Sequence, residues 1–307
     1  MNDSEIVVSV IVLTYNHKAY LRQALDSVLM QKTDFYFEIL VGDDASSDGT
    51  SEIVREYAKK YPDLIHSFIR GKNMGATANF CDLLRRSQGR YINGCEGDDY
   101  WTDPSKLQKQ VQYLEAHPEC SGCTHGIVIV DENGTPLKDQ RLRWICDKPV
   151  YTLKDFRGLF LPGHPVTLLH RNIFRTDKAA CELIEHAHLQ VADRTIAMLL
   201  ASCGEIHRLA GTMACYRKVL RKDAKNVTSR QFAAKTDSKL LEYRMNTQLE
   251  DYARNVLHVG ADFSWFRRDL LLRAVGKALL RPSAANAACL NGIWKERKKY
   301  RSTHHSI

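Results

Sequence analysis

The sequence lacks an apolar stretch long enough to cross a membrane. A membrane-spanning helix needs about 20 consecutive apolar residues, and polar or charged residues interrupt each apolar run before that length. The N-terminal segment MNDSEIVVSV has neither the basic start nor the cleavage site of a secretory signal. We therefore expect a cytoplasmic chain.

The two common glycine-rich phosphate-binding loops are also missing. No GxGxxG follows the first apolar run, and no GxxxxGK[ST] occurs anywhere, which argues against an ordinary dinucleotide or ATP site. A chain that binds phosphates without these loops needs another device, and the obvious one is a divalent cation held by carboxylates.

A zinc-binding pattern is absent as well. Of nine cysteines, only Cys120 and Cys123 form a CxxC pair, and no second pair completes a zinc site. We interpret the cysteines as reduced structural thiols.

The net charge of +8 is concentrated in the C-terminal part. Residues 261–307 contain ten Lys or Arg and three Asp or Glu, a surplus of seven. The first 260 residues are therefore nearly neutral. A basic tail indicates an anionic partner, either a membrane surface or nucleic acid.

Short runs rich in β-branched residues alternate with amphipathic segments over the first 116 residues. The predicted strands cover 6–13, 37–43, 64–70 and 90–96, and the predicted helices lie near 17–30, 50–60 and 76–88. Repeated βα units predict a mostly parallel sheet with helices on both faces.

The rhythm changes after residue 117. A strand should enter a turn at Asn133-Gly134, and a helix-like run over 193–204 should precede another strand. We expect 117–225 to extend the same sheet and face the nucleotide-binding half, 1–116. From 226 to 307 the chain should form a helical, basic extension.

Polar segments follow the predicted strands, and EGDDYW (96–101) is the most acidic. Ligands of such sheets bind beyond the carboxyl ends of the strands, and Mg²⁺ takes carboxylate and phosphate oxygens. The alternative is that Asp98 and Asp99 cap a helix near Pro104. Asp103 already fills that capping role, so we favour a metal site.

Asp43 and Asp44 form a second acidic pair after a strand. They precede SSDGT, which is a good turn and helix cap. Their spacing therefore leaves two interpretations open, a structural turn or hydrogen bonds to a base or ribose.

Four segments together resemble one family. VSVIVLTYNHKAYLRQALDSVL, EILVGDDASSDGT, GKNMGATANF and EGDDYWTDPSKLQKQ look, in order and spacing, like the nucleotide-binding half of family 2 glycosyltransferases. The resemblance covers roughly 6–220 and implies a GT-A fold, which is Rossmann-like. Members of the bacterial polysaccharide type transfer a sugar from a nucleotide diphosphate sugar, most often a UDP-sugar, to an acceptor hydroxyl.

The resemblance also implies roles for residues of the first half. Asp43 or Asp44 would contact the base, and Asp98 and Asp99 would contact ribose or phosphate and hold Mn²⁺ or Mg²⁺. Glu96 stands where many relatives have Asp, so the choice of two metal ligands among the three acids stays open. The remaining positions that match the nucleotide pocket are Thr14, Tyr15, Asn16, Lys72, Asn73 and Gly75.

In the second half the resemblance implies that Asp193 is the general base of an inverting hexosyltransferase; the alternative is a helix N-cap. Val219 stands where relatives often have His, and Arg217 or Lys218 would then supply the positive charge toward the diphosphate. His164 would lie near the acceptor wall, although a lone loop histidine is more often polar surface.

Two further alternatives concern the whole chain. Residues 261–307 form either a membrane-interface segment, with Trp265 and Phe266 entering the lipid, or helices that pack back on the domain. The chain itself is either a transferase with a glycan or lipid-linked acceptor, or a catalytically silent GT-A scaffold. No nucleic-acid-reading motif supports a nucleic-acid partner. The oligomeric state is not predicted.

Overall fold

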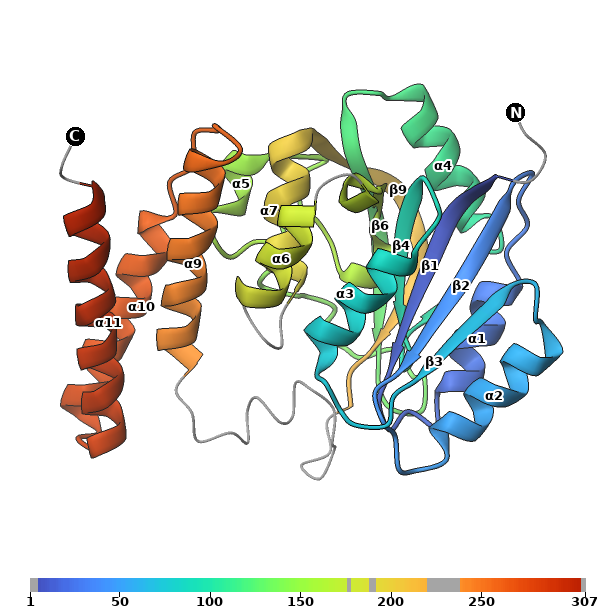
Figure 1. Ribbon diagram of the computed structural model, residues 1–307, viewed down its shortest axis with the longest axis horizontal. Helices are drawn as coiled ribbons and strands as arrows, with labels where there is room; N and C mark the ends of the chain where they lie inside the picture. The colour runs from blue at the N-terminus through green and yellow to red at the C-terminus, as the bar shows by residue number, and fades with distance from the viewer. Residues whose placement is uncertain (1–4, 176–177, 188–191, 220–237, 305–307) are drawn as a thin grey trace.

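The computed structural model describes residues 5–175, 178–187, 192–219 and 238–304. Its first part repeats strands and helices as the sequence predicts (Figure 1). These elements are β1 (Ile6–Thr14), α1 (Leu21–Leu29), β2 (Tyr36–Asp43), α2 (Thr50–Lys60), β3 (Ile65–Ile69), α3 (Ala76–Arg86), β4 (Tyr91–Glu96), β5 (Tyr100–Trp101) and α4 (Lys106–Ala116).

The second part joins the same sheet, as expected. Its elements are β6 (Cys120–Val130), β7 (Val150–Tyr151), α5 (Leu153–Phe156), η1 (Pro165–Thr167), β8 (Leu169–Arg171), η2 (Ile173–Arg175), α6 (Lys178–Ala187), α7 (Asp193–Cys203) and β9 (Glu205–Arg217). The predicted turn forms after β6, where Gly134 has a positive φ of 85° and the Asp131 amide donates to the Thr135 carbonyl.

Nine strands of the described residues form one mixed sheet. The order is β3-β2-β1-β4-β8-β6-β9-β5, with β7 beside β9. The strands β1 to β4 are parallel, while β8 runs antiparallel between β4 and β6 and so joins the two halves. The expected parallel arrangement of the first four strands is therefore confirmed.

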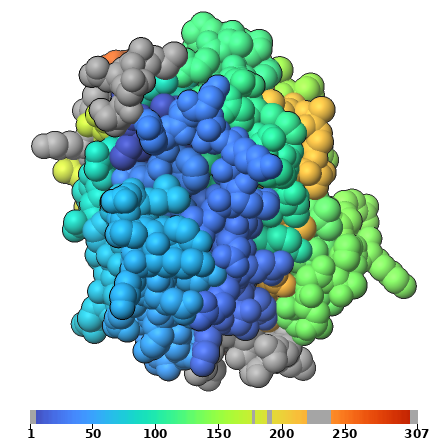
Figure 2. Space-filling model, turned by 90° about the vertical axis from the view of Figure 1, so that its right-hand side faces the viewer, coloured from blue at the N-terminus to red at the C-terminus, as the bar shows by residue number. Residues whose placement is uncertain are grey.

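The central strand β1 is buried on both faces, which explains its continuous apolar sequence. Val8, Val10 and Val12 belong to one core, which includes residues of α1, α2 and α4, whereas Ile11 belongs to another, which includes residues of α3, α6 and α7. Figure 2 views the molecule from one side, where the N-terminal third forms most of the visible surface. Because successive side chains of β1 point to opposite faces of the sheet, this one strand packs against the helices on both faces.

Three helices follow at the opposite end of the molecule from β3 (Figure 1): α9 (Ser238–Asn255), α10 (Ser264–Leu280) and α11 (Ala284–His304). The helical extension is therefore confirmed. The proposed domain boundary at 225/226 lies outside the described residues. Within the described ranges, no helix is both long and apolar enough to span a bilayer.

Glu250 of α9 is the polar centre of this helical end. Its carboxylate accepts hydrogen bonds from Arg267 of α10 at 2.6 Å, from Tyr300 of α11 at 2.7 Å and from the Phe263 amide at 2.7 Å. Burial raises the pKa of this carboxyl, but the bonds from Arg267 and Tyr300 outweigh burial and hold the pKa below its usual 4.5. One buried carboxylate thereby connects all three helices.

We expect Glu250→Ala to lower the free energy of unfolding by about 3–5 kcal/mol, because it leaves Arg267 buried without its partner. Urea unfolding measures this loss. Since the folded pKa is lowered, the stabilisation exists above pH 4.5 and disappears as pH falls through the folded pKa. The wild-type advantage should therefore shrink in acid.

The matched control is Glu296→Ala, which removes the more exposed pair with Arg244. It should change stability by less than about 1 kcal/mol. Equal effects of both variants would contradict the central role of Glu250.

Candidate active site

The carboxyl ends of β1, β2 and β4 meet at one edge of the sheet. Thr14 is in register with Asp43, and Leu13 is in register with Glu96. The Gly97 amide donates to the Leu13 carbonyl at 2.8 Å. A Cβ on Gly97 would lie 2.8 Å from the Thr14 hydroxyl oxygen and from His17 Nδ1. The acidic loop after β4 therefore packs directly on the end of β1.

Asp43 supports a turn. Its carboxylate accepts hydrogen bonds from the hydroxyls of Ser46 and Ser51, so Asp43 has the structural role that this turn requires. Asn16, with a positive φ of 57°, joins the same turn, because its amide donates to Ser46 and its side chain accepts from the Ser47 amide.

Asp44 organises the segment before α3. Its two carboxylate oxygens accept from the amides of Met74, at 2.7 Å, and Gly75, at 2.9 Å. The Asn73 side chain donates to the Asp44 carbonyl at 3.0 Å. Lys72 is exposed, and no hydrogen bond or ion pair joins it to another described residue. Hydrogen bonds thus join six of the predicted nucleotide residues into one unit: Thr14, Asn16, Asp43, Asp44, Asn73 and Gly75.

Asp98 and Asp99 do not cap a helix. The helix α4 begins at Lys106, two residues after the expected Pro104, and the Asp103 carboxylate accepts from the Ser105 amide. Asp99 is buried and accepts from the Arg217 amide at 2.8 Å. Asp98 Oδ1 and Asp99 Oδ2 are buried without a hydrogen-bond partner.

Neighbouring acids raise the pKa values of Glu96 and Asp99. Burial and the negative charges of Asp98 and Asp193 raise the pKa of Glu96 to about 8. Part of the Glu96 side chain is nevertheless exposed to solvent. Burial and the charges of Asp98 and Glu96 raise the pKa of Asp99 well above its usual range. The end of β4 therefore gathers acidic groups that disfavour one another's ionised forms.

Asp193 is the first residue of α7, and Ala192 occupies the N-cap position. The cap interpretation of Asp193 is therefore wrong for this structure. Its carboxylate accepts from the adjacent Arg194 amide at 2.8 Å. Its negative charge is one of the causes of the raised pKa of Glu96.

His164 is not polar surface, contrary to the simpler expectation. It is 8% exposed, its ring lies 4.2 Å from the Tyr216 ring, and its Nδ1 lies 3.8 Å from Asp99 Oδ2. Burial lowers the pKa of His164 to about 3, so the imidazole is neutral. The burial of Tyr216 and the charges of Asp99, Glu96 and Asp98 raise the pKa of its hydroxyl. Both rings therefore border the acidic loop.

His17 is a residue of the candidate site that the sequence did not predict. Its Nε2 lies 3.8 Å from Asp98 Oδ2, and its Nδ1 is buried without a hydrogen-bond partner. The only sequence signal was its place directly after Asn16 at the end of β1.

Arg217 does not supply a free charge for a diphosphate, which corrects that expectation. Its guanidinium donates to the carbonyls of Asp98, Asp131 and Glu132 and to the Gln23 side chain. It is 3% exposed and therefore acts as a structural clamp. Lys218 is exposed, and Val219 is partly buried.

The acidic loop fits a hard divalent cation. The unpartnered oxygens of Asp98 and Asp99 are the ligand type that Mg²⁺ and Mn²⁺ prefer. Across the described ranges, no three His, Cys, Asp or Glu side chains form a complete metal site. Phosphate oxygens and water would have to complete the coordination, which is usual for Mg²⁺.

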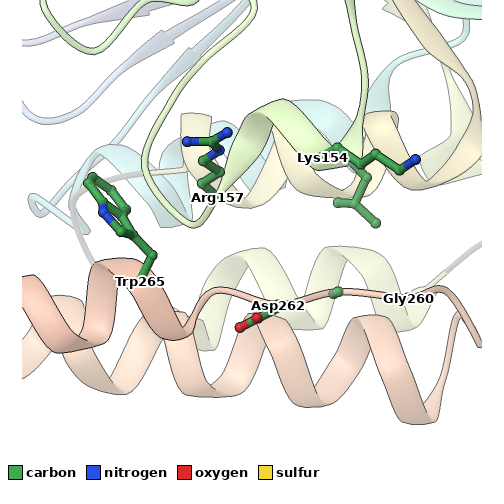
Figure 3. Close-up of a pocket in the computed structure, with 7 residues that line it drawn as sticks. Lys154, Arg157, Gly260, Asp262 and Trp265 are labelled. Atoms are coloured by element: carbon green, nitrogen blue, oxygen red, sulfur yellow. The ribbon is translucent and has the colours of Figure 1, made fainter.

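A cavity of about 340 Å³ lies elsewhere, between the α5 segment and the start of α10 (Figure 3). Lys154 and Arg157 line one wall, and Asp262 and Trp265 line the other. None of the predicted site residues lines it, so this cavity is separate from the acidic strand ends.

Comparison with known families decides the assignment. The model of glycosyl transferase family 2 matches residues 9–177, more than half of the chain. The chain belongs to this family. The family resemblance carried by the four sequence segments is therefore confirmed.

Individual relatives agree with this assignment. An uncharacterized protein of Mycobacterium tuberculosis is 38% identical over 218 residues, which cover 68% of this chain and 58% of the relative. The putative teichuronic acid biosynthesis glycosyltransferase TuaG of Bacillus subtilis is 34% identical over 137 residues, 45% of this chain and 53% of TuaG. The chain thus spans little more than half the length of these relatives.

A solved structure confirms the fold. S. aureus TarS 1-349, in complex with UDP-GlcNAc, superposes with a TM-score of 0.66 at 18% identity and covers 94% of this chain and 79% of TarS 1-349. The family 2 chain therefore has the predicted GT-A fold, with additional C-terminal helices.

We expect Arg217→Lys to lower the free energy of unfolding by about 2–4 kcal/mol. A lysine lacks the forked donors of the guanidinium, so at least two of the four acceptors lose their donor. Urea unfolding measures the loss. Lys218→Ala, on the exposed neighbour, is the control and should be nearly neutral; comparable losses in both variants would reject the clamp.

Proposed function

We propose that this family 2 chain is an inverting, metal-dependent glycosyltransferase. It moves a sugar from a nucleotide diphosphate sugar, most often a UDP-sugar in this family, to a hydroxyl of a glycan or lipid-linked acceptor. The observation that carries the proposal is the pair of unpartnered buried oxygens on Asp98 and Asp99, at a strand end that also carries the carboxyl of Glu96.

In this proposal Asp98 is the main protein ligand of Mn²⁺ or Mg²⁺. Asp98 is slightly more open than Asp99, and the other oxygen of Asp99 already accepts from the Arg217 amide. Asp99 then contributes its Oδ2 or orients the loop. The bound cation would offset the charge of the departing diphosphate by several kcal/mol.

The proposed nucleotide pocket uses the unit built on β1, β2 and the segment before α3. Thr14, Tyr15 and Asn16 border the nucleoside, and Asp43 or Asp44 contacts the base. Because both carboxylates already accept internal hydrogen bonds, a base or ribose would add to these bonds or replace them. Lys72, Asn73 and Gly75 complete the border.

Asp193 is the proposed general base. A carboxylate at the start of α7 would accept the proton of the acceptor hydroxyl as that oxygen attacks the anomeric carbon, an effect worth about 10²–10⁴ in rate. Because one base supports one displacement, the anomeric configuration inverts. His164 and Tyr216 would border the reacting groups through their contact and charge coupling with the acidic loop.

The relatives support a cell-surface glycan as the product. TuaG is named for teichuronic acid biosynthesis, and TarS was crystallised with UDP-GlcNAc. A lipid-linked acceptor would give a reason for peripheral contact of residues 261–307 with the inner face of the plasma membrane.

One observation favours the alternative, a catalytically silent GT-A scaffold. Val219 stands where the family resemblance implies a histidine, and Arg217, bound to four protein acceptors, does not replace the charge of that histidine. The retained Asp98, Asp99 and Asp193 favour the transferase.

We expect one nucleotide among UDP, GDP, TDP and CMP to bind in calorimetry only when Mn²⁺ is present. Asp98→Ala and Asp99→Ala should each weaken the metal-dependent binding by about 10- to 100-fold, because the cation loses a ligand or its support. Asp139→Ala, at an exposed carboxylate, is the control. A folded wild-type protein that binds none of the four would reject the transferase proposal.

Asp193→Asn should lower kcat by about 10²–10⁴ because the amide cannot accept the proton. The dissociation constant for the donor should stay within about twofold, and thermal unfolding should report an intact fold. Turnover equal to that of the wild type would remove Asp193 as the base. Donor binding without turnover in either protein, over a panel of acceptors, would favour the scaffold.

A further inference from the structure

The helix α10 is apolar on two opposite sides. Phe266, Leu270 and Ala274 are buried in the core of the helical end. On the other side, Trp265, Leu272 and Leu279 follow one another at seven-residue spacing and share one helix face. Leu272, Leu279 and the adjacent Leu280 are 70%, 76% and 84% exposed. We call Trp265, Leu272, Leu279 and Leu280 the apolar stripe.

Such a stripe needs an explanation. Single exposed leucines are ordinary, but a continuous exposed apolar surface marks an interaction site. The stripe also corrects the earlier membrane interpretation, because Phe266 is buried and only Trp265 of that pair is half exposed.

Basic residues surround the apolar stripe. Arg268 is exposed on the same face between Trp265 and Leu272, and Lys277 and Arg281 are exposed beside Leu279 and Leu280. Lys154 and Arg157 add two exposed cations across the cavity from Trp265 (Figure 3). The segment 261–307 carries a charge surplus of seven. The surface thus combines hydrocarbon with positive charge.

We propose that the apolar stripe docks on an anionic lipid bilayer, with its leucines and Trp265 in the acyl boundary and its Lys and Arg side chains against the headgroups. A bilayer offers hydrocarbon and negative charge in one surface, which matches both properties. A second copy of the chain matches less well, since its own stripe would bring an equal positive charge into contact.

The helix that carries the stripe contacts the residue next to the proposed base, Asp193. Arg194, next to Asp193, lies 3.7 Å from Glu242 of α9, and its guanidinium lies 5.9 Å from the Phe266 ring of α10. The start of α7 is therefore in contact with the helix that carries the stripe. The reason for docking rests on the proposed lipid-linked acceptor, whereas the docking itself is tested without nucleotide, acceptor or turnover.

The test is vesicle flotation of the full chain with phosphatidylcholine alone or with 30% phosphatidylglycerol. We expect binding to the anionic vesicles, weakened by salt, and a blue shift of tryptophan fluorescence. Leu272→Ser combined with Leu279→Ser should weaken binding by about tenfold or more. Arg268→Gln combined with Arg281→Gln should weaken binding to anionic vesicles only.

Leu241→Ser, at an exposed leucine of α9, is the matched control and should bind like the wild type. The serine variants replace exposed side chains, so unchanged thermal unfolding should accompany the loss. Equal binding by the double leucine variant and the wild type would overturn the proposal. So would a concentration-dependent dimer in ultracentrifugation that the leucine variant abolishes, or capture of an acidic protein in place of lipid. Retained nucleotide binding with no vesicle binding would reject the docking alone.

Discussion

The contact between Arg217 and the acidic loop fixes the position of that loop against the second half of the sheet. Arg217 ends β9, its amide donates to Asp99, and its guanidinium donates to the Asp98 carbonyl. The same guanidinium holds the carbonyls of Asp131 and Glu132 in the turn after β6. These hydrogen bonds are charge-assisted and Arg217 is almost fully buried, so each bond contributes more to stability than a hydrogen bond at the surface. The loop after β4 consequently has a defined position before any ligand arrives.

That fixed position creates an electrostatic cost that the protein alone does not remove. Arg217 directs its guanidinium mainly to carbonyls, so the carboxylates of Glu96, Asp98 and Asp99 remain close together with little compensation. Like charges in a buried place raise each other's pKa and disfavour the ionised form. A cation and a nucleotide diphosphate would relieve this repulsion together, because the cation neutralises the carboxylates and the phosphates complete its coordination. The same geometry would therefore suit the proposed cation, which a chain without a glycine-rich phosphate loop would use to hold a diphosphate.

Local patterns predicted the fold well and the site in part. The runs that became β1 to β4 are apolar because both faces of the sheet are covered, and this property is visible in sequence. His164 was different, since its burial depends on Asp99 and Tyr216, which lie 65 and 52 positions away in the chain. Arg217 carried a charge that suggested phosphate, but its partners come from three distant segments. Such long-range contacts leave no periodic signal.

The helical end shows how a basic tail is both packed and exposed. Phe266 and Leu270 bury one side of α10 in the core of the helical end, and the buried Glu250 holds Arg267 of the same helix. The tail is therefore packed on the domain along one side of α10 and exposed along the other. The charge surplus lies mostly outside this packed centre, because Arg267 is the basic side chain that Glu250 buries. The remaining cations share the surface with the apolar stripe. Arg194 contacts both α9 and α10 from the start of α7, so the helix that carries the stripe is in contact with the helix that carries Asp193.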